Sequence, residues 1–476
     1  MKLIAKHLVR LALFCGCLLG PTVPAQEVRR ALPVEPTVAE TPARGVGPDV
    51  APAPPAPVAP SRNRPAAETP AVGIAPNVQL GPVPAPAVAT GPASVNDTAR
   101  FLAGMPVSTG SSLVLLEQNP SWQQHASFFD QAWARLAARQ FTGIRDWEVN
   151  YLPDATQPIP VVFYMFSGPD LLYANQFFPN AGTYILAGAE PIGPLPDVTR
   201  FAGPALDSVL QNLQRSLNSV LSFSFFITKE MKTDLQNEQL KGTLPIFYVF
   251  LARAGKTITD VSFLTLDRSG EAQSAVPNEK GKGLTPGVRI TFTGAPGAPP
   301  QTLYYFTTDL SNEGIHAQPG FLKFCRTQGM GASLLKSASY LMFENGFSSV
   351  RNFLLEQSKA IVQDDSGIPI AAFDQSKWLL RFFGNYAGPI EIFKQYYQPQ
   401  LQGLYQQSNP APLAFGIGYR WSPRQSTLIV ATLRGTEVSP LRTEQPQLPP
   451  PPSGPSAVAP SPPVPTPTSS PRLLRM

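Results

Sequence analysis

Two short polar turns contain the residues of this sequence whose types and spacing could do chemistry. Ser167 and Asp170 belong to a Ser-Gly-Pro-Asp turn that follows the apolar run 160–166. Asp364 and Asp365 belong to an Asp-Asp-Ser-Gly turn that follows the apolar residues 360–362. Carboxylates at the end of a strand can face a ligand, bind a cation or share a proton. The same residue types also cap helices and form tight turns, so a purely structural role is the alternative interpretation.

Two further residues extend this set of candidates. Glu344 lies in the turn Glu344-Asn345-Gly346, and it would form an acidic pocket if that turn meets Asp364 and Asp365. His316 lies in the polar segment 312–316, which we interpret as a loop, and a loop histidine is free to act as an acid or base. Each also has a plain interpretation as a solvated residue. The candidate ligand-facing residues are therefore Ser167, Asp170, His316, Glu344, Asp364 and Asp365.

The scarcity of metal ligands and of catalytic motifs argues against most enzymatic schemes. The 476 residues contain three histidines and three cysteines, and His7, Cys15 and Cys17 all precede residue 26. No cluster of His and Cys has the spacing of a metal site, and no glycine loop has the frame of a phosphate site. The turn at Ser167 is also not a Gly-x-Ser-x-Gly elbow. We therefore expect no metal and no cofactor, and we expect Cys325 to be a buried apolar residue.

The first 25 residues have the pattern of a cleavable secretory signal. Lys2, Lys6 and Arg10 precede a short apolar run from 11 to 19, and Val23-Pro24-Ala25 suits a signal peptidase that cuts before residue 26. The run is about half the length that spans a bilayer. A lipoprotein modified at Cys17 is the alternative that we favour less. We expect an exported protein, periplasmic or secreted, with no transmembrane span after cleavage.

Proline-rich segments flank the region that can build a core. Residues 26–97 and 441–476 are dominated by Pro, Ala and Val or by Pro and Ser, and such segments bury too little apolar surface to fold. We therefore expect a disordered linker, a folded domain over 98–440 and a disordered tail. Without the three basic residues of the signal, 34 basic residues face 32 acidic ones, so nucleic acid is not an expected partner.

The pattern within 98–440 predicts an α+β fold: a mixed, largely antiparallel sheet covered by amphipathic helices. Apolar residues at helical spacing predict helices over about 120–136 and 204–221, whereas 160–166, 183–187, 257–266, 288–293 and 302–307 have the composition of strands. The apolar runs 244–251 and 340–343 are also interpreted as strands. The order strand, turn, helix, strand occurs both at 164–187 and at 340–362, which suggests two related units and a duplication boundary near 310–340.

Function is the least determined property at this level. We expect an exported bacterial envelope or secreted protein, most simply a non-enzymatic binding or scaffolding domain on a long spacer, whose partner is an envelope polymer or protein. A sugar-binding surface could be supplied by three aromatic segments, although aromatic residues more often fill cores. They are 378–386 with Arg381, Tyr396 with Tyr397, and 419–421. The alternative is a hydrolase that acts on an envelope polymer through paired carboxylates. The sequence leaves the oligomeric state open.

Overall fold

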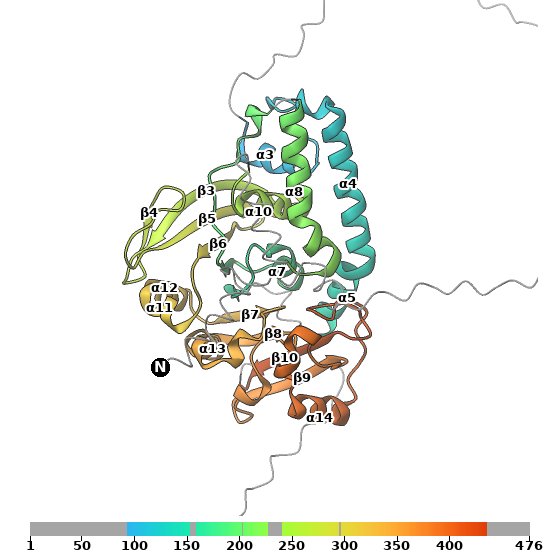
Figure 1. Cartoon of the computed structure of the whole chain (residues 1–476), viewed down its shortest axis with the longest axis vertical. Coiled ribbons are helices and arrows are strands. Elements are labelled where there is room, and N and C mark those ends of the chain that lie inside the picture. The colour runs from blue at the N-terminus through green and yellow to red at the C-terminus, as the bar shows by residue number, and fades with distance from the viewer. Residues whose placement is uncertain (1–92, 153–158, 202, 227–239, 295–296, 436–476) are drawn as a thin grey trace, which may run out of the picture.

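The structure is a computed structural model that describes residues 93–152, 159–201, 203–226, 240–294 and 297–435. The predicted signal peptide, nearly all of the predicted linker and the predicted tail lie outside the described residues. The described fold is α+β, as the sequence predicts, with ten strands in one mixed sheet and helices on both of its faces (Figure 1). It begins with the helix α3 (Val95–Leu102), a few residues before the predicted boundary at 98.

The sheet has the order β4-β3-β5-β6-β2-β1-β7-β8-β10-β9. Its five central strands, from β6 to β8, are parallel, and the strands outside them pair antiparallel. Five of the nine pairs of neighbouring strands among the described residues are therefore antiparallel. In chain order the strands are β1 (Val161–Tyr164), β2 (Thr183–Gly188), β3 (Thr257–Leu266), β4 (Ala272–Ser274), β5 (Thr285–Thr293), β6 (Gln301–Thr307), β7 (Gly331–Leu335), β8 (Ser358–Gln363), β9 (Trp378–Gly384) and β10 (Thr427–Leu433).

Alternation of side chains along the central strands creates two separate cores. In β1, Val162 and Tyr164 belong to one apolar cluster, whereas Val161 and Phe163 belong to the other. Because both of its faces are buried, β1 is apolar throughout rather than alternating. The first face is covered by α3, α4 (Pro120–Leu136), α5 (Thr142–Tyr151), α7 (Leu171–Phe177), α8 (Pro204–Phe223) and α10 (Leu244–Arg253). The second face is covered by α11 (Asn312–Ala317), α12 (Gly320–Thr327), α13 (Ser348–Gln357) and α14 (Pro399–Ser408).

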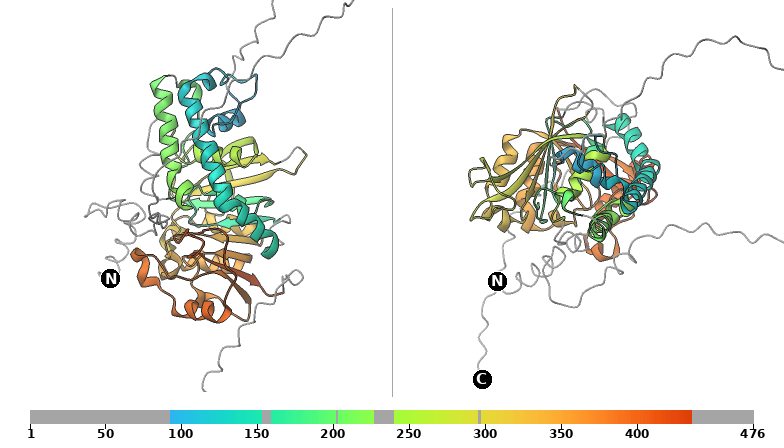
Figure 2. Two further views of the ribbon diagram at one scale, coloured as in Figure 1. Left: turned by 90° about the vertical axis from the view of Figure 1, so that its right-hand side faces the viewer. Right: turned by 90° about the horizontal axis from the view of Figure 1, so that it is seen from above.

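The long helices confirm the sequence prediction most closely. The stripe predicted over 204–221 is α8, and α4 has the predicted bounds; the two helices lie side by side along one face (Figures 1 and 2). Pro120 and Pro204 each occupy the first turn, where a missing N–H costs nothing. Within the described part of the chain, no helix is both long and apolar enough to cross a bilayer.

Two of the predicted strands are wrong. Residues 244–251 form the helix α10, whose side chains from Leu244 to Ala252 are all buried. An element that is apolar on every side has no periodicity, so the sequence could not distinguish a buried helix from a buried strand. Residues 341–343 form the 3-10 turn η4 (Leu341–Phe343), and the strand that precedes α13 is β7 instead. The sequence pattern did not reveal this strand because its first three residues, Gly331, Ala332 and Ser333, lack the large apolar side chains that are typical of a buried strand.

Two strand-helix-strand units nevertheless lie next to each other at the centre of the sheet. The first is β1-α7-β2 and the second is β7-α13-β8, and β1 pairs with β7 in parallel. The chain leaves β1 towards one edge of the sheet and β7 towards the other. The helices α7 and α13 correspondingly cover opposite faces. The two crossovers therefore have the same hand, as expected for parallel strands. A duplication remains a prediction.

Candidate functional site

The strand order reverses between β1 and β7, and this point defines the candidate site. Val162 pairs with Ala332 and Phe163 with Ser333, so both strands end at the same edge of the sheet. In open sheets of this kind, ligands bind beyond the carboxyl ends of the strands at such a reversal. We call this edge, where β1, β7, β8 and β9 end and β10 begins, the carboxyl edge. The predicted turns after β1 and β8 both lie there.

A buried ion pair connects the two strands at the reversal. Lys336 Nζ lies 2.9 Å from Asp170 Oδ2, and the two side chains are 1% and 3% exposed. The Tyr164 hydroxyl donates to the same oxygen at 2.9 Å, and Asp170 Oδ1 accepts the Tyr173 N–H at 3.2 Å. Burial raises the pKa of the Asp170 carboxyl, and Lys336 opposes that effect. Asp170 is therefore a helix cap, the structural role that the sequence allowed, and also one half of an ion pair.

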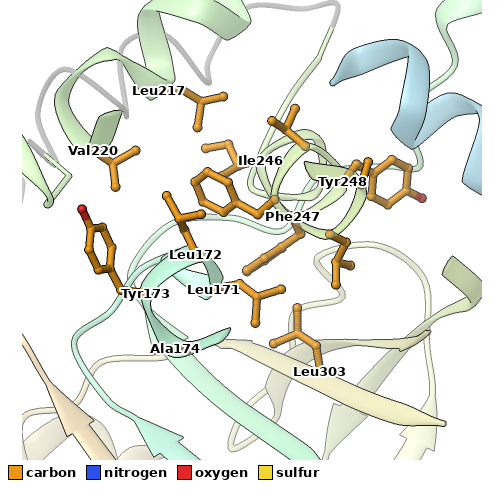
Figure 3. Packing of buried hydrophobic residues seen from close by; sticks show 14 of the residues in the cluster. Leu171, Leu172, Tyr173, Ala174, Leu217, Val220, Ile246, Phe247, Tyr248 and Leu303 are labelled. Carbon is orange, nitrogen blue, oxygen red and sulfur yellow. The ribbon is translucent and has the colours of Figure 1, made fainter. Parts of the chain in front are cut away.

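Lys336 is held from two further sides. Its Nζ donates to the Ser224 carbonyl at the end of α8 and lies 4.3 Å from the ring centroid of Tyr173 on α7. Figure 3 shows how α7 is fixed, with Leu172 packed beside side chains of α8 and α10. A lysine fully enclosed in this way links three elements. Lys336 is not among the residues predicted from the sequence; the available signal was a charged residue directly after the apolar residues Leu334 and Leu335.

Residues in the left-handed backbone region gather around this pair. Non-glycine residues rarely adopt positive φ, and strained positions of this kind concentrate at functional sites. Seven such residues occur among the described residues, and two of them are asparagines, which tolerate the conformation. The other five lie at or against the carboxyl edge: Phe166 (φ 60°), Ser224 (68°), Ser337 (53°), Ser339 (54°) and Tyr340 (55°). The backbone after β1 and after β7 is thus strained at the reversal.

Phe166 gives a direct measure of that strain. It packs edge-on against Phe347 at 5.9 Å between ring centroids, and its left-handed backbone costs about 1–2 kcal/mol. Phe166→Ala removes the ring contact and keeps the strain, whereas Phe166→Gly removes both. We expect the glycine variant to be more stable than the alanine variant by about 1 kcal/mol in urea denaturation. Equal stability of the two variants would show that the backbone at 166 is unstrained.

Asp364 holds the strained segment after β7. Its Oδ2 accepts the Ser337 N–H at 2.8 Å, and its Oδ1 accepts the Ser366 N–H at 2.9 Å and the Ser366 hydroxyl. The Ser366 hydroxyl oxygen in turn accepts the Ala338 N–H at 2.8 Å. Asp364 is 1% exposed; burial raises the pKa of its carboxyl, and the hydrogen bonds from Ser366 and Ser337 oppose that effect. The Asp-Asp-Ser-Gly turn therefore clamps the backbone of its neighbouring strand.

Asp365 has a different environment on the other side of the same turn. Its Oδ2 accepts the Tyr340 hydroxyl at 2.6 Å. Burial, and then the charge of Asp364, raises the pKa of the Asp365 carboxyl to about 7. Adjacent buried carboxyls share protons in this way, because two charges at close range in a dry site are unfavourable.

Tyr340, which binds Asp365, belongs to a set of three nearly parallel tyrosine rings, and we call them the tyrosine stack. Tyr340 lies between Tyr396 and Tyr419, with ring centroids 5.3 Å and 6.4 Å away and interplanar angles of 5° and 13°. The Tyr396 hydroxyl donates to Glu344 Oε1 at 2.9 Å, and the Tyr419 hydroxyl donates to the Ser337 carbonyl at 2.9 Å. Glu344 and Asp365 each bind one tyrosine of a stacked pair, so they are linked through Tyr396 and Tyr340, and an acidic pocket in which they meet stays a prediction.

The remaining predicted residues lie elsewhere. The Ser167 hydroxyl donates to the Gly168 carbonyl within its own turn, and Ser167 is buried. His316 is exposed in the last turn of α11, so the segment that we interpreted as a loop is a short helix. Cys325 is buried, as predicted, and burial raises the pKa of its thiol. Among the described residues, no three His, Cys, Asp or Glu side chains come together to form a metal site.

Another buried carboxyl, Glu148 on α5, lies outside the carboxyl edge. Glu148 is 2% exposed, its Oε1 has no hydrogen-bond partner, and burial raises the pKa of the carboxyl to about 7. Its folded-state pKa exceeds the ordinary value of 4.5, so stability is full at acidic pH and falls as pH rises towards 7. We expect Glu148→Gln to stabilise the protein by about 1–2 kcal/mol at pH 8 and little at pH 4, measured by urea denaturation. Equal effects at both pH values would contradict this interpretation.

Comparison with protein-family models, with curated proteins and with solved structures finds no match to this chain.

Proposed function

We propose that this protein is an exported, non-enzymatic binding module of a bacterial cell envelope, carried on a proline-rich spacer, and that its ligand face is the carboxyl edge. The observation that supports this most strongly is the gathering of five strained, non-glycine residues where the strand order reverses. Strain of this kind persists only where surrounding structure holds it, and it is typical of ligand sites. Here the clamp from Asp364 and the ion pair between Asp170 and Lys336 hold it.

The chemistry of the face favours an envelope polymer with sugar rings. Tyr397 is 48% exposed, and its ring stacks on buried Tyr386 with centroids 5.8 Å apart and planes at 16°. The neighbouring Tyr396 is half-buried and stacks on Tyr340. Each ring is therefore fixed from one side by another tyrosine. A rigid aromatic face loses little conformational entropy when an apolar sugar face packs on it.

Carboxylate chemistry fits the binding role better than hydrolysis. A glycosidase needs one carboxyl to protonate the leaving group and another to attack or activate water. Asp170 is engaged by Lys336 and Tyr164, and Asp364 is engaged by three donors from the backbone and Ser366. Neither oxygen pair is presented to a substrate. Hydrolysis is the second candidate function because of Asp365: a carboxyl with a pKa of about 7 suits a general acid.

A co-sedimentation experiment tests the binding role. The purified protein is mixed with insoluble cell-wall polysaccharide, and we expect Tyr397→Ala to weaken binding about tenfold, equivalent to about 1.4 kcal/mol. Tyr397→Phe keeps the ring and should bind like the wild type. Val276→Ala, at a residue 65% exposed between β4 and β5, is a control for unspecific adhesion. Equal binding by the wild type and Tyr397→Ala would contradict the proposed face.

The same mixtures separate binding from hydrolysis. Soluble fragments are measured after long incubation with the wild type and with Asp365→Asn. If the wild type releases fragments and Asp365→Asn does not, the protein is a hydrolase and the non-enzymatic role is overturned.

The predicted export is tested by mass spectrometry of the mature amino terminus. An amino terminus at Gln26 supports the predicted cleavage, whereas a lipid-modified Cys17 shows that the protein is anchored to a membrane instead.

A further inference from the structure

Two adjacent carboxyls at the carboxyl edge have unequal hydrogen bonding. Asp364 and Asp365 are 1% and 6% exposed, so both are removed from water. Asp364 accepts two backbone N–H groups and a hydroxyl, which stabilise its charge. Asp365 Oδ2 accepts the hydroxyl of Tyr340. When one proton is shared between such neighbours, it resides on the carboxyl whose charge is less well solvated, and here that is Asp365.

The titratable groups that act on Asp365 come from several elements. They are Asp364 after β8, Tyr340 after β7, Tyr386 after β9, Arg420 before β10 and Tyr405 on α14. Gln398 Nε2 donates to the Asp365 carbonyl and not to its carboxyl. Arg420 is the cation of this set, and its guanidinium donates to the carbonyls of Gly388 and Pro389. The Arg420 guanidinium is thus hydrogen-bonded to a loop.

We propose that a change in the protonation of Asp365, in the buried pair that it forms with Asp364, is transmitted through the Tyr340 hydroxyl and controls the tyrosine stack on the ligand face. Tyr340 is the middle ring of the stack, and its backbone is left-handed. An ionised Asp365 accepts the Tyr340 hydroxyl in a charge-assisted bond and holds the ring in place. Protonation removes the charge and weakens that bond. Tyr396 and Tyr419 lose their fixed middle ring at the same time.

The role in ligand binding rests on the proposed function, whereas the proton switch itself does not. Near-ultraviolet circular dichroism of the ligand-free protein follows the tyrosine environments from pH 5 to pH 9. We expect a step with a midpoint near pH 7 that is absent in Asp365→Asn. Glu148→Gln is the matched control, because it removes the other buried carboxyl that titrates near pH 7 and should keep the step. No step in the wild type, or a step that persists in Asp365→Asn, overturns the switch.

A second variant covers the case in which Asp365→Asn does not fold. Tyr340→Phe keeps the ring but removes the hydroxyl that connects Asp365 to the stack, so the dichroism step should disappear in this variant. A step that persists unchanged in Tyr340→Phe would show that the signal does not pass from Asp365 through Tyr340, and it would overturn the switch. Polymer binding is measured separately across the same pH range and should strengthen above pH 7. A dichroism step with no polymer binding would support the switch and contradict the proposed ligand, so the two failures are distinguishable.

Discussion

Lys336→Met is expected to destabilise the fold by about 3–5 kcal/mol at neutral pH, because it leaves the Asp170 carboxylate buried without its cation. Methionine has a length similar to that of lysine, so the change tests charge more than volume. The loss should shrink as pH falls, since a protonated Asp170 needs no cation. Urea denaturation at pH 7 and pH 4 measures both effects.

The double variant Lys336→Met with Asp170→Asn is the matched control for that prediction. It removes both charges, and its stability should recover towards that of the wild type, because replacement of a whole buried ion pair is often nearly neutral. A single Lys336→Met variant within about 1 kcal/mol of the wild type would show that the pair contributes little to the fold.

Asp364→Ala is the second change with a large expected effect, about 3–5 kcal/mol. It leaves the Ser337 N–H, the Ser366 N–H and the Ser366 hydroxyl without their acceptor in a buried site, and each unsatisfied group costs about 1–3 kcal/mol. The variant should also lose polymer binding, since the segment after β7 is released. Thermal and urea denaturation measure the first effect, and co-sedimentation measures the second.

The chain offers a close control for Asp364 in another Asp-x-Ser turn. Asp374 Oδ1 accepts the Ser376 N–H at 2.9 Å and the Ser376 hydroxyl at 2.6 Å, but these bonds are exposed to water. Asp374→Ala should therefore cost less than about 1 kcal/mol, because water replaces the lost acceptor. Similar costs for Asp364→Ala and Asp374→Ala would mean that the turn itself, and not its contact with Ser337, carries the effect.

Local patterns in the sequence were sufficient to predict the helices and strands that have one polar face. The stripe of α8 and the strands β3 and β6 follow from spacing alone, since their apolar residues recur with the period of their structure. The cap at Asp170 also follows from residue type, because a carboxylate before a helix accepts a free N–H. The predicted α+β class depends on these elements.

Elements that are buried on every side could not be identified in the same way. In α10 the apolar residues surround the helix, and in β7 small residues conceal the strand, so neither has a local signature. The contacts that decide these segments come from distant parts of the chain. The misplacement of the second unit at 340–343 follows directly from the missed strand.

The sequence by itself determined that Ser167, Asp170, Asp364 and Asp365 follow apolar strands, because residue type and position relative to a strand are local properties. Only the tertiary structure decided that β1 and β7 are neighbours, and with that pairing it brought Lys336 to Asp170 and Ser337 to Asp364. These partners are separated by 166 and 27 positions, as their numbers show. Strand pairing depends on packing across the whole sheet, which no single stretch of residues encodes.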